Sequence, residues 1–298
     1  ALESADLRAL SSAALRSLSS DQLAALTSDQ IGALSTGQVA ALTTTQVAQL
    51  NSDDLNALTT TQFAALTSSQ AVALTTDQIP TLESSDLRAL SSAALRAWST
   101  EQLGALSSDN MGALTTGQVA ALTTAQIASL ISDDLNALGT AQFAVLTTAQ
   151  VASLTSSQIA SLESADLRAL GTAQYAALTS AQVQGLGSDQ MIALESADLR
   201  ALSSAALRSL SSDQLAALTS DQIGALSTGQ VAALTTTQVS QLNSEDLNAL
   251  TTQQFAALTS AQAVALTTDQ IPTLESSDLR ALSSAALRAW STEQLGAL

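Results

Sequence analysis

The residues best placed to do chemistry are neighbouring carboxylates. Two pairs, Asp53–Asp54 and Asp133–Asp134, invite a calcium site, but calcium takes six to eight oxygen ligands, and neither an EF-hand loop nor a glycine-rich calcium nonapeptide is present. Similar carboxylates recur along the whole chain and do not converge on one cleft, as acid–base catalysis requires. We therefore expect capping residues on a solvated face, and we predict no catalytic, cofactor-binding or metal-binding residues.

The composition excludes several classes of function. The 298 residues contain no Cys, His or Lys, so thiol and imidazole chemistry and Cys/His zinc sites are excluded. Nine Arg stand against 26 acidic residues, and the net charge of −17 repels nucleic acid and anionic membranes. No apolar run reaches the length of about 18 residues that a membrane helix needs. We predict a protein that is not an enzyme, needs no cofactor, and neither binds nucleic acid nor inserts into a membrane.

An eight-residue repeat organises the chain. From Glu3 onward the sequence divides without a gap into 37 octads of the pattern [ST]-[ST]-x-Q-h-x-A-L, where h is apolar. The second place is Ser or Thr in every octad, and the eighth is Leu except at Trp98 and Trp290. All three Phe and the single Tyr occupy the fifth place, where we expect core packing. The period predicts one continuous repeat array over residues 1–298.

The period also distinguishes between fold classes. Eight residues rotate a continuous helix so that no fixed apolar face results, and in a strand places five and eight point to opposite faces. One short helix per octad fits better, because a first-place Ser or Thr with Gln three residues later forms a capping box. We predict an all-α solenoid of very short capped helices, with a β-solenoid as the alternative. The invariant second-place hydroxyls are expected to form a ladder between coils.

A longer rhythm lies above the octad. Octads of the type ES[AS]DLRAL begin five blocks, and octads of the type [NI]S[DE]DLNAL follow three of them by 48 residues. The blocks are 3–82, 83–162, 163–194, 195–274 and 275–298. Every interval is a multiple of 16, which suggests two octads per solenoid turn.

Prolines and charged residues gather where one block meets the next. Pro80 and Pro272 stand in the sixth place of the octad before an ES octad and are expected to end their helices early. Glu83, Asp86 and Arg88 are expected to form a small surface ion-pair cluster, whose contribution to stability would be modest.

The LTTxQhxAL pattern resembles the octapeptide arrays of giant secreted or surface-exposed bacterial proteins, including adhesin-like and haemagglutinin-like exoproteins. The resemblance covers the whole chain, and it implies an extracellular or cell-surface location and an extended scaffold role. Neither end looks like a capping repeat, so either the chain is cut from a longer array or its ends are covered by the next copy, and end-to-end association is expected in the second case. We expect a structural stalk, spacer or self-assembling filament. The alternative is a binding module whose regular Ser/Thr surface contacts glycans, ice or another cell.

Overall fold

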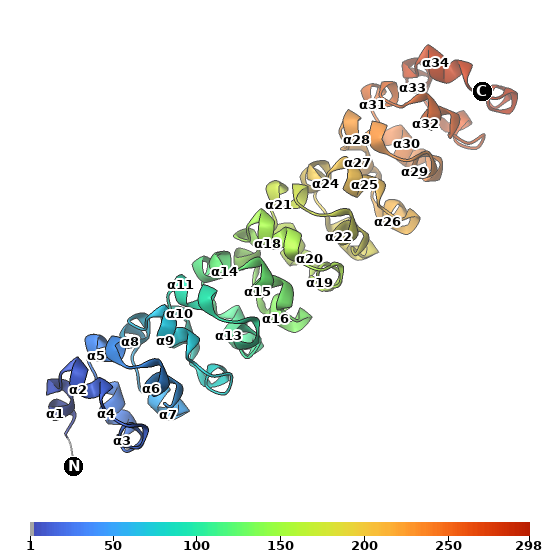
Figure 1. Cartoon of the computed structure of the whole chain (residues 1–298). Coiled ribbons are helices and arrows are strands. Elements are labelled where there is room, and N and C mark those ends of the chain that lie inside the picture. The colour runs from blue at the N-terminus through green and yellow to red at the C-terminus, as the bar shows by residue number, and fades with distance from the viewer. Residues whose placement is uncertain (1–2) are drawn as a thin grey trace. The chain divides into compact units, whose positions relative to one another are not determined.

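The protein is all-helical. The computed structural model describes residues 3–298 and divides at Leu146 into two compact units, Ala1–Leu146 and Thr147–Leu298. Each unit is a solenoid of short helices joined by tight turns, and no strand occurs in the described part of the chain (Figure 1). The predicted all-α solenoid is therefore confirmed, and the β-solenoid alternative is wrong. That the array is continuous over 1–298 stays a prediction.

Each octad forms one helix of four to six residues, except the two proline octads. Unit 1 contains α1 (Ser4–Ala9), α2 (Ser12–Arg16), α3 (Ser20–Ala24), α4 (Ser28–Gly32), α5 (Thr36–Ala41), α6 (Thr44–Ala48), α7 (Ser52–Asn56), α8 (Thr60–Ala64), α9 (Ser68–Val72), η1 (Ile79–Thr81), α10 (Ser84–Ala89), α11 (Ser92–Ala97), α12 (Thr100–Leu103), α13 (Ser108–Gly112), α14 (Thr116–Ala121), α15 (Thr124–Ser129), α16 (Ser132–Ala137) and α17 (Thr140–Ala144). Unit 2 contains α18 (Thr148–Ser153), α19 (Ser156–Ser161), α20 (Ser164–Ala169), α21 (Thr172–Ala176), α22 (Ser180–Gln184), α23 (Ser188–Ala193), α24 (Ser196–Ala201), α25 (Ser204–Arg208), α26 (Ser212–Ala217), α27 (Ser220–Gly224), α28 (Thr228–Ala233), α29 (Thr236–Gln241), α30 (Ser244–Ala249), α31 (Thr252–Ala256), α32 (Ser260–Val264), η2 (Ile271–Thr273), α33 (Ser276–Ala281), α34 (Ser284–Arg288) and α35 (Thr292–Gly296).

A capping box starts most of these helices. In α4 the backbone N–H of Thr27 donates to Gln30 Oε1 at 2.8 Å, and the N–H of Gln30 donates to the Thr27 hydroxyl at 3.3 Å. The first octad place is the N-cap, as expected. Glu83 and Ile131 occupy the same place, but their side chains make no capping hydrogen bond. The N-termini of these two helices therefore lack the stabilisation that a capping side chain gives.

The superhelical turn takes three to four octads. Within each unit, a helix packs against the third helix along the array, as α2 does against α5 and α27 against α30. Gln118 reaches further back and donates from Nε2 to the carbonyls of Leu87 and Leu90, at 2.8 and 2.9 Å. The expected two octads per turn is wrong, because intervals of 16 residues reflect the lengths of the blocks and not the path of the backbone.

The core consists of the fifth and eighth places. The three Phe and Tyr175 are fully buried, which confirms their assignment to the interior. Trp98, in an eighth place, is also buried, and its indole Nε1 donates to the carbonyl of Ala71 at 2.9 Å. Since a helix of one or two turns is unstable alone, this shared interior supplies most of its stability.

The prolines shorten their helices without interrupting the stack. Residues before Pro80 form a turn followed by η1, because proline lacks the N–H that a continuing helix needs. Ile79 stays fully buried, and Gln78 still donates to the Leu50 carbonyl at 2.6 Å. The expected early ending is confirmed. Within the described residues no helix has both the length and the apolar character to cross a membrane.

Candidate functional site: three arginine-lined grooves

The two acidic residues of a pair lie in different environments, one exposed to solvent and one buried. Asp53 is exposed, whereas Asp54 is buried and accepts a hydrogen bond from the Ser28 hydroxyl at 3.0 Å. The same bond joins Ser108 to Asp134 and Ser220 to Asp246. The expectation of a solvated face is therefore wrong for the second acid of each pair.

The second-place hydroxyls do not form the expected ladder. Where they bond across helices, they donate to a fourth-place side chain three octads later, as Ser28 does to Asp54 and Ser84 to Asn110. Over residues 3–298, no group of three or more acidic side chains is arranged to hold a metal ion.

Four of the five ES octads bury a carboxyl without a hydroxyl partner of this kind, at Asp86, Asp166, Asp198 and Asp278. Asp86 is buried in the place that Gln usually occupies, and burial, with a smaller contribution from Glu83, raises its pKa to about 6. Burial and the neighbouring Glu195 raise the pKa of Asp198 to about 6 in the same way. Among the described residues, Arg88 forms no ion pair with either acid of its octad. The expected ion-pair cluster is therefore wrong.

Three equivalent grooves lie beside these octads, with volumes of about 440, 390 and 370 Å³. Each is lined on one side by the sixth-place Arg of an ES octad. Three octads later, the segment Gly-Ala-Leu and the two residues after it line the groove, and seven octads after the ES octad a fourth-place Gln completes it. The three arginines are Arg200, Arg8 and Arg88. No acidic residue lines any of the three, in a chain whose net charge is −17.

Glycine forms the floor of each groove. A Cβ added to Gly224 would lie 2.6 Å from the carbonyl oxygen of Ala249, and Gly32 and Gly112 meet the equivalent oxygens at 2.5 and 2.6 Å. Only glycine allows the two backbones to approach so closely. A second glycine in the following octad, represented by Gly229, faces open space. The first glycine is thus needed for packing, whereas the second leaves the rim clear.

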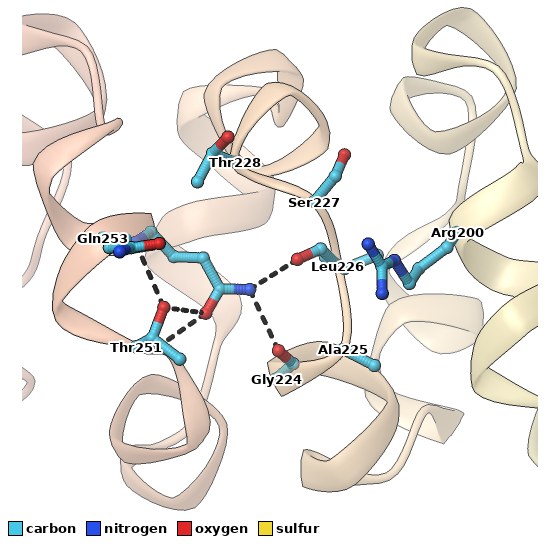
Figure 2. Close-up of a pocket in the computed structure, with 9 residues that line it drawn as sticks. Arg200, Gly224, Ala225, Leu226, Ser227, Thr228, Thr251 and Gln253 are labelled. Atoms are coloured by element: carbon cyan, nitrogen blue, oxygen red, sulfur yellow. Dashed lines mark hydrogen bonds between the residues drawn. The ribbon is translucent and has the colours of Figure 1, made fainter.

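Figure 2 shows the groove of unit 2. The Gln254 amide donates from Nε2 to the carbonyls of Gly224 and Leu226 at 3.0 and 2.6 Å, and the Thr251 hydroxyl donates to Gln254 Oε1 at 2.8 Å. These bonds fix one wall. Arg200, which follows the buried Leu199 in α24, extends from the other side toward the Leu226–Ser227 segment. Among residues 3–298, none forms a hydrogen bond with its guanidinium.

A fourth arginine in the same place, Arg168, lines none of these three grooves. Arg168 donates from Nε to the Ala193 carbonyl at 3.0 Å. Ile192 stands where the floor glycine would be, and Glu195 stands where the other copies have Ser or Thr. In the three arginine-lined grooves, the glycine and the uncharged rim come from other octads than the arginine.

Sequence reasoning missed these grooves, although their signal was present. The three ES octads that are followed 48 residues later by an [NI]S[DE]DLNAL octad are the three that contribute a groove arginine. That second octad supplies the Asp54-type partner of the Ser–Asp bond and the carbonyl that faces the floor glycine. The prediction that the chain has no catalytic, cofactor-binding or metal-binding residue stays a prediction.

Short capped helices stacked in register, each bonded to the turn before it, define a tandem-repeat helical solenoid. The chain belongs to the ALTTAQ repeat family, which matches it eight times in succession. The matched residues are 1–36, 47–82, 79–116, 127–163, 159–194, 191–228, 239–276 and 271–298. A comparison with curated proteins found no match.

Proposed function

We propose that this array is a structural element: a non-catalytic stalk or spacer whose length is set by the number of its octads. The observation that carries the proposal is the bonding of the fourth-place Gln. Each turn directs its buried polar groups to the turn before it, as Gln182 does by donating to the carbonyls of Val151 and Leu154, both at 2.7 Å. A structure built from such nearest-neighbour contacts grows by adding repeats without any change in its interior.

Small-angle X-ray scattering tests this role. The maximum dimension of the 298-residue chain is compared with that of a variant lacking residues 83–162, a deletion that keeps the octad register. We expect the maximum dimension to fall roughly in proportion to the residues removed, because contacts are made only between neighbouring turns. Globular particles whose dimension changes only with the cube root of mass would contradict the proposal.

We further propose that copies associate end to end. Gln22 is exposed and carries the same amide that elsewhere donates to the carbonyls of a preceding turn. An amide of this kind is complementary to the helix-end carbonyls of a second copy. Size-exclusion chromatography with light scattering tests this: association should increase with concentration and weaken in Gln22→Ala. A strictly monomeric chain at all concentrations would refute the proposal.

We propose an extracellular or cell-surface location, which agrees with the resemblance to exoprotein arrays and with the absence of Cys from the sequence. The test is antibody labelling of intact and of permeabilised cells that make the protein. Equal labelling of both supports the proposal, whereas labelling only after permeabilisation refutes it.

A further inference from the structure

We propose that the three arginine-lined grooves are binding sites for an acidic sugar residue, a uronic acid being the simplest example. Each site consists of an exposed guanidinium, a glycine floor and a rim of hydroxyl and amide groups. This goes beyond the structural role proposed above, because a spacer needs no such sites.

The guanidinium determines the charge of the ligand. Arg200 and its two equivalents line grooves that contain no acidic residue, although acidic residues outnumber arginines 26 to 9 along the chain. Guanidinium groups bind carboxylate and sulfate through paired, charge-assisted hydrogen bonds, which fix orientation as well as supplying affinity. A neutral ligand would leave this group unused.

The side chains at the rim of the groove determine which uncharged groups the ligand carries. In the groove of unit 2, Thr228 is exposed and lines the groove together with Gln253. No aromatic side chain and no exposed large apolar side chain lines the groove, so it is unsuited to a lipid or a flat aromatic ligand. Donors and acceptors around one cation match the hydroxyl groups of a sugar ring that carries one acid.

The volume of the grooves and the net charge of the protein restrict the class of ligand further. The volumes of about 370 to 440 Å³ fall at the lower end of the range for small-molecule sites. The net charge of −17 opposes polymers of high negative charge density, such as nucleic acid, and a ring carrying a single charge is repelled less. A further groove, lined by Glu163 and Asp189 and without arginine, lacks the feature that would hold an anion.

The test is a titration of the whole 298-residue protein, followed by saturation-transfer NMR, with three probes: trigalacturonate, neutral galactotriose and inorganic sulfate. We expect trigalacturonate to bind with a Kd on the order of 1 mM and galactotriose to bind at least about tenfold more weakly. The triple variant R8Q/R88Q/R200Q should lower the affinity for trigalacturonate at least about tenfold. The matched control R168Q should leave it unchanged, because Arg168 donates to the Ala193 carbonyl and lines none of the three grooves.

Every outcome decides the proposal. Binding of trigalacturonate that survives in the triple variant, that is lost equally in R168Q, or that galactotriose matches would overturn it, as would no binding at all. Sulfate binding without trigalacturonate binding would also overturn it, since the groove would then hold a free anion and no sugar. Circular dichroism melting curves establish that each variant is folded. Because these exposed guanidinium groups make no hydrogen bond to the backbone, the solenoid should be unaffected.

Discussion

Replacing Asp86 by Asn should stabilise unit 1 at neutral pH. The fourth place normally holds an amide that donates to carbonyls of the preceding turn, and a carboxylate has no proton to donate. Asn110 shows that a side chain of aspartate's length is long enough, since its Nδ2 donates to the Leu82 carbonyl, 28 residues earlier, at 2.9 Å. By the same spacing, the amide introduced by D86N would donate to the Leu58 carbonyl, whereas Asp86 can do so only when protonated.

The size of the effect follows from the pKa. Burial and Glu83 raise the pKa of Asp86 from 3.8 to about 6, so folding favours the protonated form. The stabilising contribution is therefore complete below pH 3.8, and it is lost as pH rises through 6. This difference between the pKa values of the unfolded and folded states corresponds to a loss of about 3 kcal/mol in the free energy of unfolding by about pH 7.5. The amide keeps its protons at every pH, so D86N should exceed the wild type by roughly that amount at neutral pH and match it in acid.

Thermal unfolding followed by circular dichroism at about pH 3.5 and about pH 7.5 measures this difference. For a unit of this size, Tm should rise by roughly 5 to 10 °C in D86N at the higher pH and hardly change at the lower. The converse variant, Asn110→Asp, should lose stability only at the higher pH. Equal shifts of D86N at both pH values, or a destabilised D86N at neutral pH, would refute the reasoning, since the carboxyl would then not face the carbonyls in the way the amide does.

Two matched pairs of substitutions test the packing. Gln118→Ala removes a buried amide that donates to two carbonyls of the preceding turn, so urea denaturation should show a loss of about 2 to 5 kcal/mol. Gln22→Ala removes an exposed amide and should cost less than about 1 kcal/mol; equal losses in the two would contradict the inferred bonding. Gly224→Ala places a Cβ 2.6 Å from the Ala249 carbonyl and should destabilise by about 1 to 3 kcal/mol. Gly229→Ala meets nothing within 4 Å and should be neutral or stabilising, a contrast that thermal melting would reveal or refute.

Local features were predictable from the sequence because they depend on neighbours in the chain. The capping box needs only Ser or Thr with Gln three residues later, and both Thr27 and Gln30 take the roles that this spacing assigns. The shortened proline helices and the buried fifth place follow in the same way from one octad read alone. These interactions do not depend on how the octads stack.

Features that depend on stacking were not predictable from the sequence. The fourth-place Gln also donates to carbonyls of the preceding turn, and predicting this requires knowing which carbonyls lie opposite it. The spacing of similar octads does not reveal that a turn takes three to four octads. Asp54 was misjudged for the same reason: its partner, Ser28, is 26 residues away and reaches it only through the superhelix. The repeated pattern shows that the octads are equivalent, but it does not show which octads contact one another.

The superhelical path also explains which octads line the three arginine grooves. Each of the three is lined by the Arg of one octad, the glycine three octads on and the Gln seven octads on, so it extends over eight consecutive octads. The blocks 3–82, 83–162 and 195–274 each contain ten octads and hold a complete groove. The block 163–194 contains four octads, so the residue that corresponds for Arg168 to the Ser227 of Arg200 is Glu195, the first residue of the next block. Block length therefore decides which octads follow each arginine: Arg200 lines a groove, whereas Arg168 donates to the Ala193 carbonyl.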